Sequence, residues 1–101
     1  MSVGRDALEA RWLHLTRVAL PEAAAARPHW PVRLDHCFQR VLLDNACGGR
    51  WYDHVPRRPA YRHCPEPMLA RALDLAERVL AGQADLHALN RRSLAWRGKE
   101  R

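Results

Sequence analysis

Residues 67–82, PMLARALDLAERVLAG, carry the clearest periodic pattern in the chain. Their apolar residues recur every three or four positions, at Leu69, Ala72, Leu73, Ala76, Val79 and Leu80. This spacing lines them up along one face of an α-helix. Pro67 suits a first helical turn, and Gly82 suits the left-handed conformation that often ends a helix. We therefore predict a helix between these two residues, with one apolar face.

Two more segments, before and after this one, also show helical spacing. One stripe in the first segment consists of Leu34, Phe38, Val41, Leu42 and Asn45, and Gly48 and Gly49 follow it as end signals. One face of the second segment consists of Leu86, Leu89, Ser93 and Trp96. Asp85 precedes that face as an N-cap residue and Gly98 follows it. The sequence predicts a helix in each segment.

The N-terminal segment predicts a further helix, from about Asp6 to Leu20. Asp6 and Glu9 have the spacing of a capping box. One face carries Leu8, Trp12, Leu15 and Ala19. Pro21 either ends this helix or opens a second short one, because proline is tolerated in a first turn but not in a helix interior. In both cases we expect a break at Pro21.

These elements predict an all-α protein. No segment alternates strictly between apolar and polar residues, as a half-buried strand would. The 101 residues fit a single domain over 1–101, with a charged tail at 98–101. We expect a small three- to four-helix bundle with a long irregular loop between the second and third main helices, over residues 48–67.

The bulk composition indicates a cytoplasmic protein without a membrane partner. No run approaches the roughly 18 apolar residues of a membrane span, and charges stand where a signal peptide has its apolar region. The cysteines Cys37, Cys47 and Cys64 are odd in number and irregular in spacing. Free thiols in a reducing compartment explain them more simply than a disulfide framework does.

The net charge of +6 points to an acidic partner, with nucleic acid first among the candidates. Of the 17 basic side chains, Lys99 alone is a lysine. Such one-sided arginine usage has a second explanation, because GC-rich codons favour arginine together with alanine and leucine. Charge alone does not separate these two explanations.

The predicted loop, GGRWYDHVPRRPAYRHCPEP at 48–67, interleaves arginines with aromatic residues. Guanidinium groups hold phosphates and aromatic faces stack on bases, so this mixture suits single-stranded nucleic acid. The candidate contacts are Arg50, Trp51, Arg57, Arg58, Tyr61 and Arg62. Trp, Tyr and Arg also anchor protein interfaces, so a protein partner or a second copy of the chain is the alternative. A third interpretation is that the aromatic rings cover the core while the arginines are merely solvated.

A second basic group lies near the C-terminus, where Arg91, Arg92 and Arg97 extend the candidate nucleic-acid surface. Cations at the end of a helix are also favourable for the helix dipole. Whether this group adjoins the 48–67 segment decides between the two interpretations.

The sequence predicts no metal site, no cofactor and no assigned catalytic residue. His36 beside Cys37 and His63 beside Cys64 are immediate neighbours, whereas structural zinc ligands are usually two to four residues apart. A small enzyme that uses His54, His63 or Cys64 is a third functional hypothesis. It requires two of these side chains to converge in one cleft.

Asp44 stands at the end of the second predicted helix, where the helix dipole disfavours a carboxylate. Such a local conflict either marks a constrained site or is relieved by a nearby cation. We expect a pair with Arg40, four residues earlier, or with an arginine of the 48–67 segment.

The stretches RLDHCFQRVLLDNACGGRWYDHV, RPAYRH and LNRRSLAWRGK resemble a group of short uncharacterised bacterial proteins, over about residue 30 to the end. Some members of this group are labelled GNAT-type acetyltransferases. That label implies a mixed α/β scaffold and a Q/R-x-x-G-x-G/A turn that holds acetyl-CoA. The sequence contains neither the strands nor the turn, so no catalytic residue is transferred from the resemblance.

Overall fold

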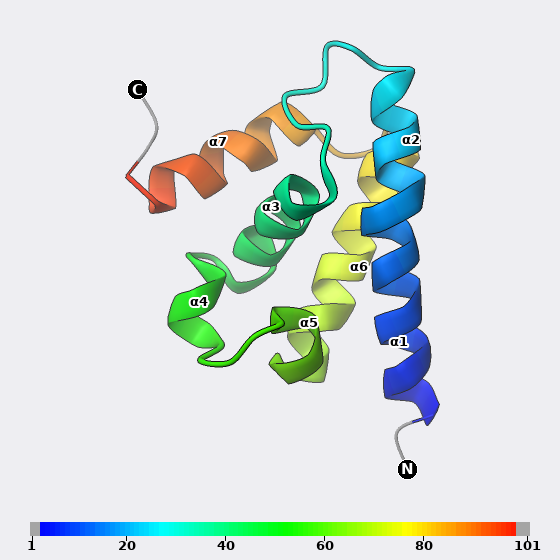
Figure 1. The fold of residues 1–101 in the computed structure, drawn as a ribbon. Helices are drawn as coiled ribbons and strands as arrows, with labels where there is room; N and C mark the ends of the chain where they lie inside the picture. The colour runs from blue at the N-terminus through cyan, green and yellow to red at the C-terminus, as the bar shows by residue number, and fades with distance from the viewer. Residues whose placement is uncertain (1–2, 99–101) are drawn as a thin grey trace.

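The computed structural model describes residues 3–98, and every regular element in that range is a helix. The N-terminal part forms one long rod, which joins α1 (Val3–His14), the π-helical turn η1 (Leu15–Ala19) and α2 (Leu20–Ala25). Figure 1 shows the rod running along one side of the molecule, with α2 continuing in the direction of α1. Of the two alternatives predicted at Pro21, the structure has the second, because Pro21 lies in the first turn of the short helix α2, but the rod continues there without an interruption.

The π-helical turn explains how the rod continues through Pro21. Proline has no N–H to donate to the preceding turn, so it normally interrupts a helix. Here the N–H of Leu20 donates to the carbonyl of Leu15, five residues back, which widens the helix just before the proline. Pro21 then occupies the first turn of α2, a position that proline tolerates.

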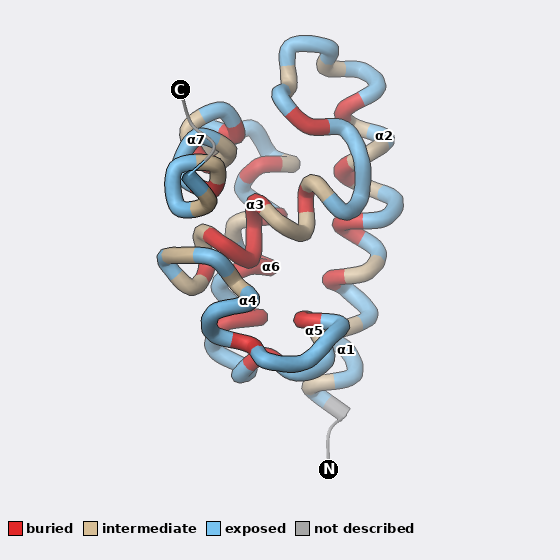
Figure 2. The backbone as a smooth tube through the Cα atoms, turned by 60° about the vertical axis from the view of Figure 1, so that its left-hand side comes forward, coloured by how far each residue is buried: buried red, intermediate tan, exposed pale blue. Residues whose placement is uncertain are grey.

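Helix α3 (Asp35–Cys47) lies at the centre of the molecule and packs against α6, α7 and η1. Phe38, Val41 and Leu42 are completely buried on it. Figure 2 shows that buried positions gather on α3 and on the sides of its neighbours that face it. The helix ends at Gly48, whose φ of 72° is the left-handed conformation expected from the sequence.

The remaining long helices, α6 (Glu66–Leu80) and α7 (Leu86–Trp96), confirm the predictions for their segments. The apolar face of α6 is buried except at Leu80, which is half-buried, and Gly82 follows with a φ of 76°. Asp85 caps α7 by accepting a hydrogen bond from the N–H of Ala88 at 3.2 Å. Trp96 departs from its predicted apolar face, because its side chain is exposed.

The 48–67 segment is not irregular throughout. It contains two single-turn helices, α4 (Trp51–His54) and α5 (Ala60–His63), and α6 begins at Glu66. Val55 and Cys64 are buried in the hydrophobic core and attach the segment to it. A single turn is too short to show a helical period, so the sequence pattern did not reveal these helices.

Other differences concern the chain ends. Helix α1 begins at Val3, so Asp6 lies inside it instead of capping it, and Glu9 pairs with Arg5 at 2.9 Å. Most of the predicted tail at 98–101 lies outside the described residues. Within residues 3–98, no helix combines the length and the apolar character that crossing a bilayer requires.

Candidate functional site

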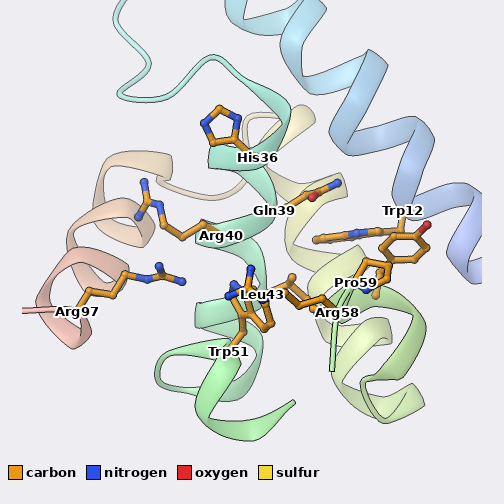
Figure 3. Close-up of a pocket in the computed structure, with 11 residues that line it drawn as sticks. Trp12, His36, Gln39, Arg40, Leu43, Trp51, Arg58, Pro59 and Arg97 are labelled. Carbon is orange, nitrogen blue, oxygen red and sulfur yellow. The ribbon is translucent and has the colours of Figure 1, made fainter. Parts of the chain in front are cut away.

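A cleft of about 630 Å³ lies between α1, α3, the 51–61 segment and the end of α7. This volume falls within the range of about 300–1,000 Å³ that is typical of ligand-binding pockets. Its lining combines cations and aromatic rings, namely Arg40, Arg58, Arg97, Trp12, Trp51 and Tyr61. Among the described residues, no carboxylate lines it. Figure 3 shows Arg40 and Arg97 on one side of the cleft and Trp12 on the other.

Asp44 fixes the side of the cleft that α7 forms. Its carboxylate is completely buried and accepts hydrogen bonds from Arg97 Nε at 2.7 Å and Arg97 Nη2 at 3.0 Å. It also accepts from Ser93 Oγ at 2.7 Å and from the backbone N–H of Trp51 at 2.9 Å. Asp44 therefore joins α3, α4 and α7 through one group.

The prediction of which cation pairs with Asp44 is wrong. The cation that pairs with it is Arg97 of α7, and neither Arg40 nor an arginine of the 48–67 segment forms this salt bridge. The pair raises the pKa of Arg97, and burial opposes this only in part. Both Arg97 and Asp44 are thereby committed to holding the fold.

Arg40 is held differently, by neutral groups. Its Nη1 donates to Ser93 Oγ at 2.7 Å and its Nη2 to Asn90 Oδ1 at 2.9 Å. Partial burial lowers the pKa of Arg40 below its ordinary value, although Cys37 and Asp44 raise it to a lesser extent. The guanidinium still carries its charge at neutral pH, in a place where that charge lacks full compensation.

Helix α4 presents aromatic rings that are already stacked with arginines. The Arg58 guanidinium lies 5.0 Å from the centroid of the Trp51 ring. The ring of Tyr52 has Arg97 at 5.1 Å and Arg50 at 5.4 Å. The end of α7 and the 48–67 segment are thus neighbours, which the sequence left undecided.

The predicted contact residues divide into two groups. Trp51, Arg58, Tyr61 and Arg97 line the cleft. The other five are exposed and do not line the cleft: Arg50, Arg57, Arg62, Arg91 and Arg92. Of these, Arg50 forms a surface salt bridge with Asp53 at 2.8 Å, which raises its pKa.

The residues of the enzyme hypothesis do not line the cleft. His54 and His63 are exposed, and Cys64 is buried under α1. Burial raises the pKa of the Cys64 thiol, and Arg5 offsets this only in part, so the sulfur stays protonated and weakly nucleophilic at neutral pH. Within residues 3–98, no group of three His, Cys, Asp or Glu side chains is arranged to hold a metal ion.

Sequence reasoning missed seven residues of the cleft lining, namely Trp12, His36, Gln39, Arg40, Leu43, Pro59 and Ala60. Trp12 matched a core position by its spacing, and Gln39 and Arg40 fell outside the apolar stripe of the second predicted helix. Their common location depends on how the N-terminal rod packs against α3 through η1, which the sequence pattern of either segment does not contain. Arg58 and Tyr61 were found because they share one short segment with Trp51.

Comparison of the chain with protein-family models, curated proteins and solved structures finds no match in any of the three.

Proposed function

We propose that the protein binds single-stranded nucleic acid at this cleft. In this proposal the aromatic side chains receive an unstacked base, and the arginines of the cleft and its surroundings hold the neighbouring phosphates. Single strands are commonly bound in this way, by a basic groove that carries aromatic stacking surfaces. The net charge of +6 supports an acidic partner as well.

The observation that carries the proposal is the state of Arg40. This cation is partly buried, its hydrogen bonds go to the neutral side chains of Ser93 and Asn90, and its pKa is lowered. Taking a charge out of water is costly, and a bound anion offsets that cost. Arg58 is a second cation of the cleft lining, and among the described residues no carboxylate lines the cleft to neutralise it. A phosphate placed there therefore meets two guanidinium groups.

The exposed arginines outside the cleft extend the surface that a strand needs. Arg57 and Arg62 belong to the same segment as Arg58 and Tyr61. A mononucleotide would not require them, whereas a strand that continues beyond the cleft passes charged side chains. We place this activity in the cytoplasm, where thiols such as those of Cys37, Cys47 and Cys64 stay reduced.

The test compares two variants that lose the same charge from different places. Arg40→Gln removes the cation of the cleft, and Arg78→Gln removes an exposed cation of α6 that pairs with Asp74. We expect Arg40→Gln to weaken binding of a fluorescein-labelled single-stranded 12-mer about tenfold or more, since a charged hydrogen bond contributes about 1.5–3 kcal/mol. Arg78→Gln should stay within about twofold of the unmodified protein, as expected for a screened surface charge.

Fluorescence anisotropy measures both affinities, and circular dichroism confirms that each variant is folded. Equal binding by folded Arg40→Gln and Arg78→Gln would contradict the proposal. Arg58→Gln provides a second probe of the cleft, because Arg58 is exposed and its loss leaves the packing of α3 against α7 intact.

A protein partner is the second candidate, favoured by two exposed aromatic side chains. Tyr52 and Trp96 are 40% and 37% exposed, and large aromatic residues of this kind anchor protein interfaces. Sedimentation analysis of the protein alone tests the simplest form of this candidate. A concentration-dependent dimer that Tyr52→Ala abolishes would support it.

A further inference from the structure

The inner wall of the cleft holds an amide whose orientation is fixed by its neighbours. The hydroxyl of Thr16 donates its one proton to the carbonyl of Trp12 at 2.9 Å. Thr16 Oγ1 can therefore only accept a further hydrogen bond. Gln39 supplies that bond by donating from Nε2 at 3.0 Å. The oxygen Oε1 of Gln39 is thus the acceptor left over, and it takes part in no hydrogen bond with the described residues.

Trp12 provides a donor on the same wall. Its side chain is completely buried, and its indole Nε1 has no hydrogen-bond partner among residues 3–98. Buried indole N–H groups usually find an acceptor, so an orphan at the lining of a cleft calls for an explanation. Figure 3 shows the indole reaching from α1 into the cleft next to Gln39.

From these two groups we infer that the cleft takes one nucleobase and recognises its edge as well as its face. This inference rests on the proposed function and adds the chemistry of recognition to it. Each nucleobase carries a hydrogen-bond donor next to an acceptor on its Watson–Crick edge, and single strands leave that edge open. Trp12 Nε1 donates to the acceptor of the base, and Gln39 Oε1 accepts from its donor.

Trp51 provides the surface on which the face of the base stacks. In the structure its ring is covered by the Arg58 guanidinium at 5.0 Å. A base that takes this position stacks on the indole and releases Arg58 to the adjacent phosphate. Because all bases offer a donor and an acceptor on this edge, the cleft binds any base. It binds a sugar-phosphate unit without a base more weakly.

The experiment compares a single-stranded octamer with an octamer of the same length in which every residue is abasic. We expect the unmodified protein to bind the base-containing strand about tenfold or more tightly, as stacking and edge hydrogen bonds together require. Trp12→Phe keeps an aromatic ring and removes the donor, and Gln39→Met keeps the length and removes the acceptor. Both variants should lose most of this preference while they bind the abasic strand as well as before.

The outcomes separate this inference from the proposed function. If the unmodified protein binds neither strand, the proposed function fails. If it binds both strands equally, or if both variants keep the full preference, edge recognition alone fails. A thermal melt checks folding, and Gln39→Met, at a half-buried position, carries the test if Trp12→Phe does not fold. Uridine monophosphate as a competitor distinguishes a site for free nucleotides, which it would block at micromolar concentration, from a site that requires a strand.

Discussion

Arg40 and Asp44 lie one turn apart on α3, and they have opposite roles. Asp44 is completely buried, and its charge is matched by Arg97. Arg40 is partly buried, and its charge is held by neutral groups. The sequence indicated a conflict at Asp44 because a carboxylate at a helix end is unfavourable. It did not identify Arg97 as the partner, since that pair forms across 53 positions of the chain.

The buried pair makes a strong prediction for stability. Asp44→Ala leaves Arg97 without its partner and also removes the acceptor for Ser93 and for the N–H of Trp51. Breaking a buried pair in this way costs about 3–5 kcal/mol of unfolding free energy. Urea denaturation measures this loss of unfolding free energy. Asp74→Ala, which removes an exposed salt bridge with Arg78, serves as the control and should cost at most about 1 kcal/mol.

Cys64 makes a prediction for pH. Burial raises its pKa above the ordinary value of 9.0, so at alkaline pH the unfolded chain loses this proton while the folded protein retains it. The free energy of unfolding therefore falls as the pH rises toward and past 9.0, and well below that pH this thiol contributes no pH dependence. We expect Cys64→Ala to show a shallower decline between about pH 8 and pH 10. Identical slopes for the two proteins in urea denaturation would show that Cys64 is not responsible.

At the scale of elements, capping signals and periodicity were sufficient for α3, α6 and α7. Gly48 and Asp85 act as the sequence predicts, at the end of one helix and the start of another. The π-helical turn η1 was not predicted, because it depends on a backbone adjustment before Pro21 that leaves no periodic signal. Helices α4 and α5 were missed for a related reason, since one turn has no period to detect.

The position of α5 depends on a residue of α1. Arg5 Nη2 donates to the carbonyl of Cys64 at 2.7 Å and to that of Tyr61 at 2.9 Å, which ties this short helix to the rod. Removing the guanidinium leaves both carbonyls without this donor, so Arg5→Ala should cost about 1–3 kcal/mol of unfolding free energy. It should also speed amide exchange at residues 60–64. Arg11→Ala, whose partner Glu77 is exposed, should leave the exchange at 60–64 unchanged.

At the scale of the whole molecule, the cleft forms because the N-terminal rod packs against α3 through η1, while α4 and α7 both pack against α3. A radius of gyration of 12.9 Å shows how closely these elements pack. The all-helical character followed from local patterns, whereas the cleft follows from contacts between segments far apart in the sequence. Trp12 and Arg40 illustrate this, because each matched an ordinary helical position until the other helix was placed beside it.

The salt dependence of binding to a single-stranded oligonucleotide tests the central claim most directly. The cleft and its surrounding arginines predict binding at micromolar concentration or tighter in about 50 mM salt, because several phosphates lose their counterions to guanidinium groups. Between about 50 and 200 mM salt the affinity should fall about tenfold or more, in proportion to the number of phosphates held. Negligible binding at both salt concentrations would contradict the account.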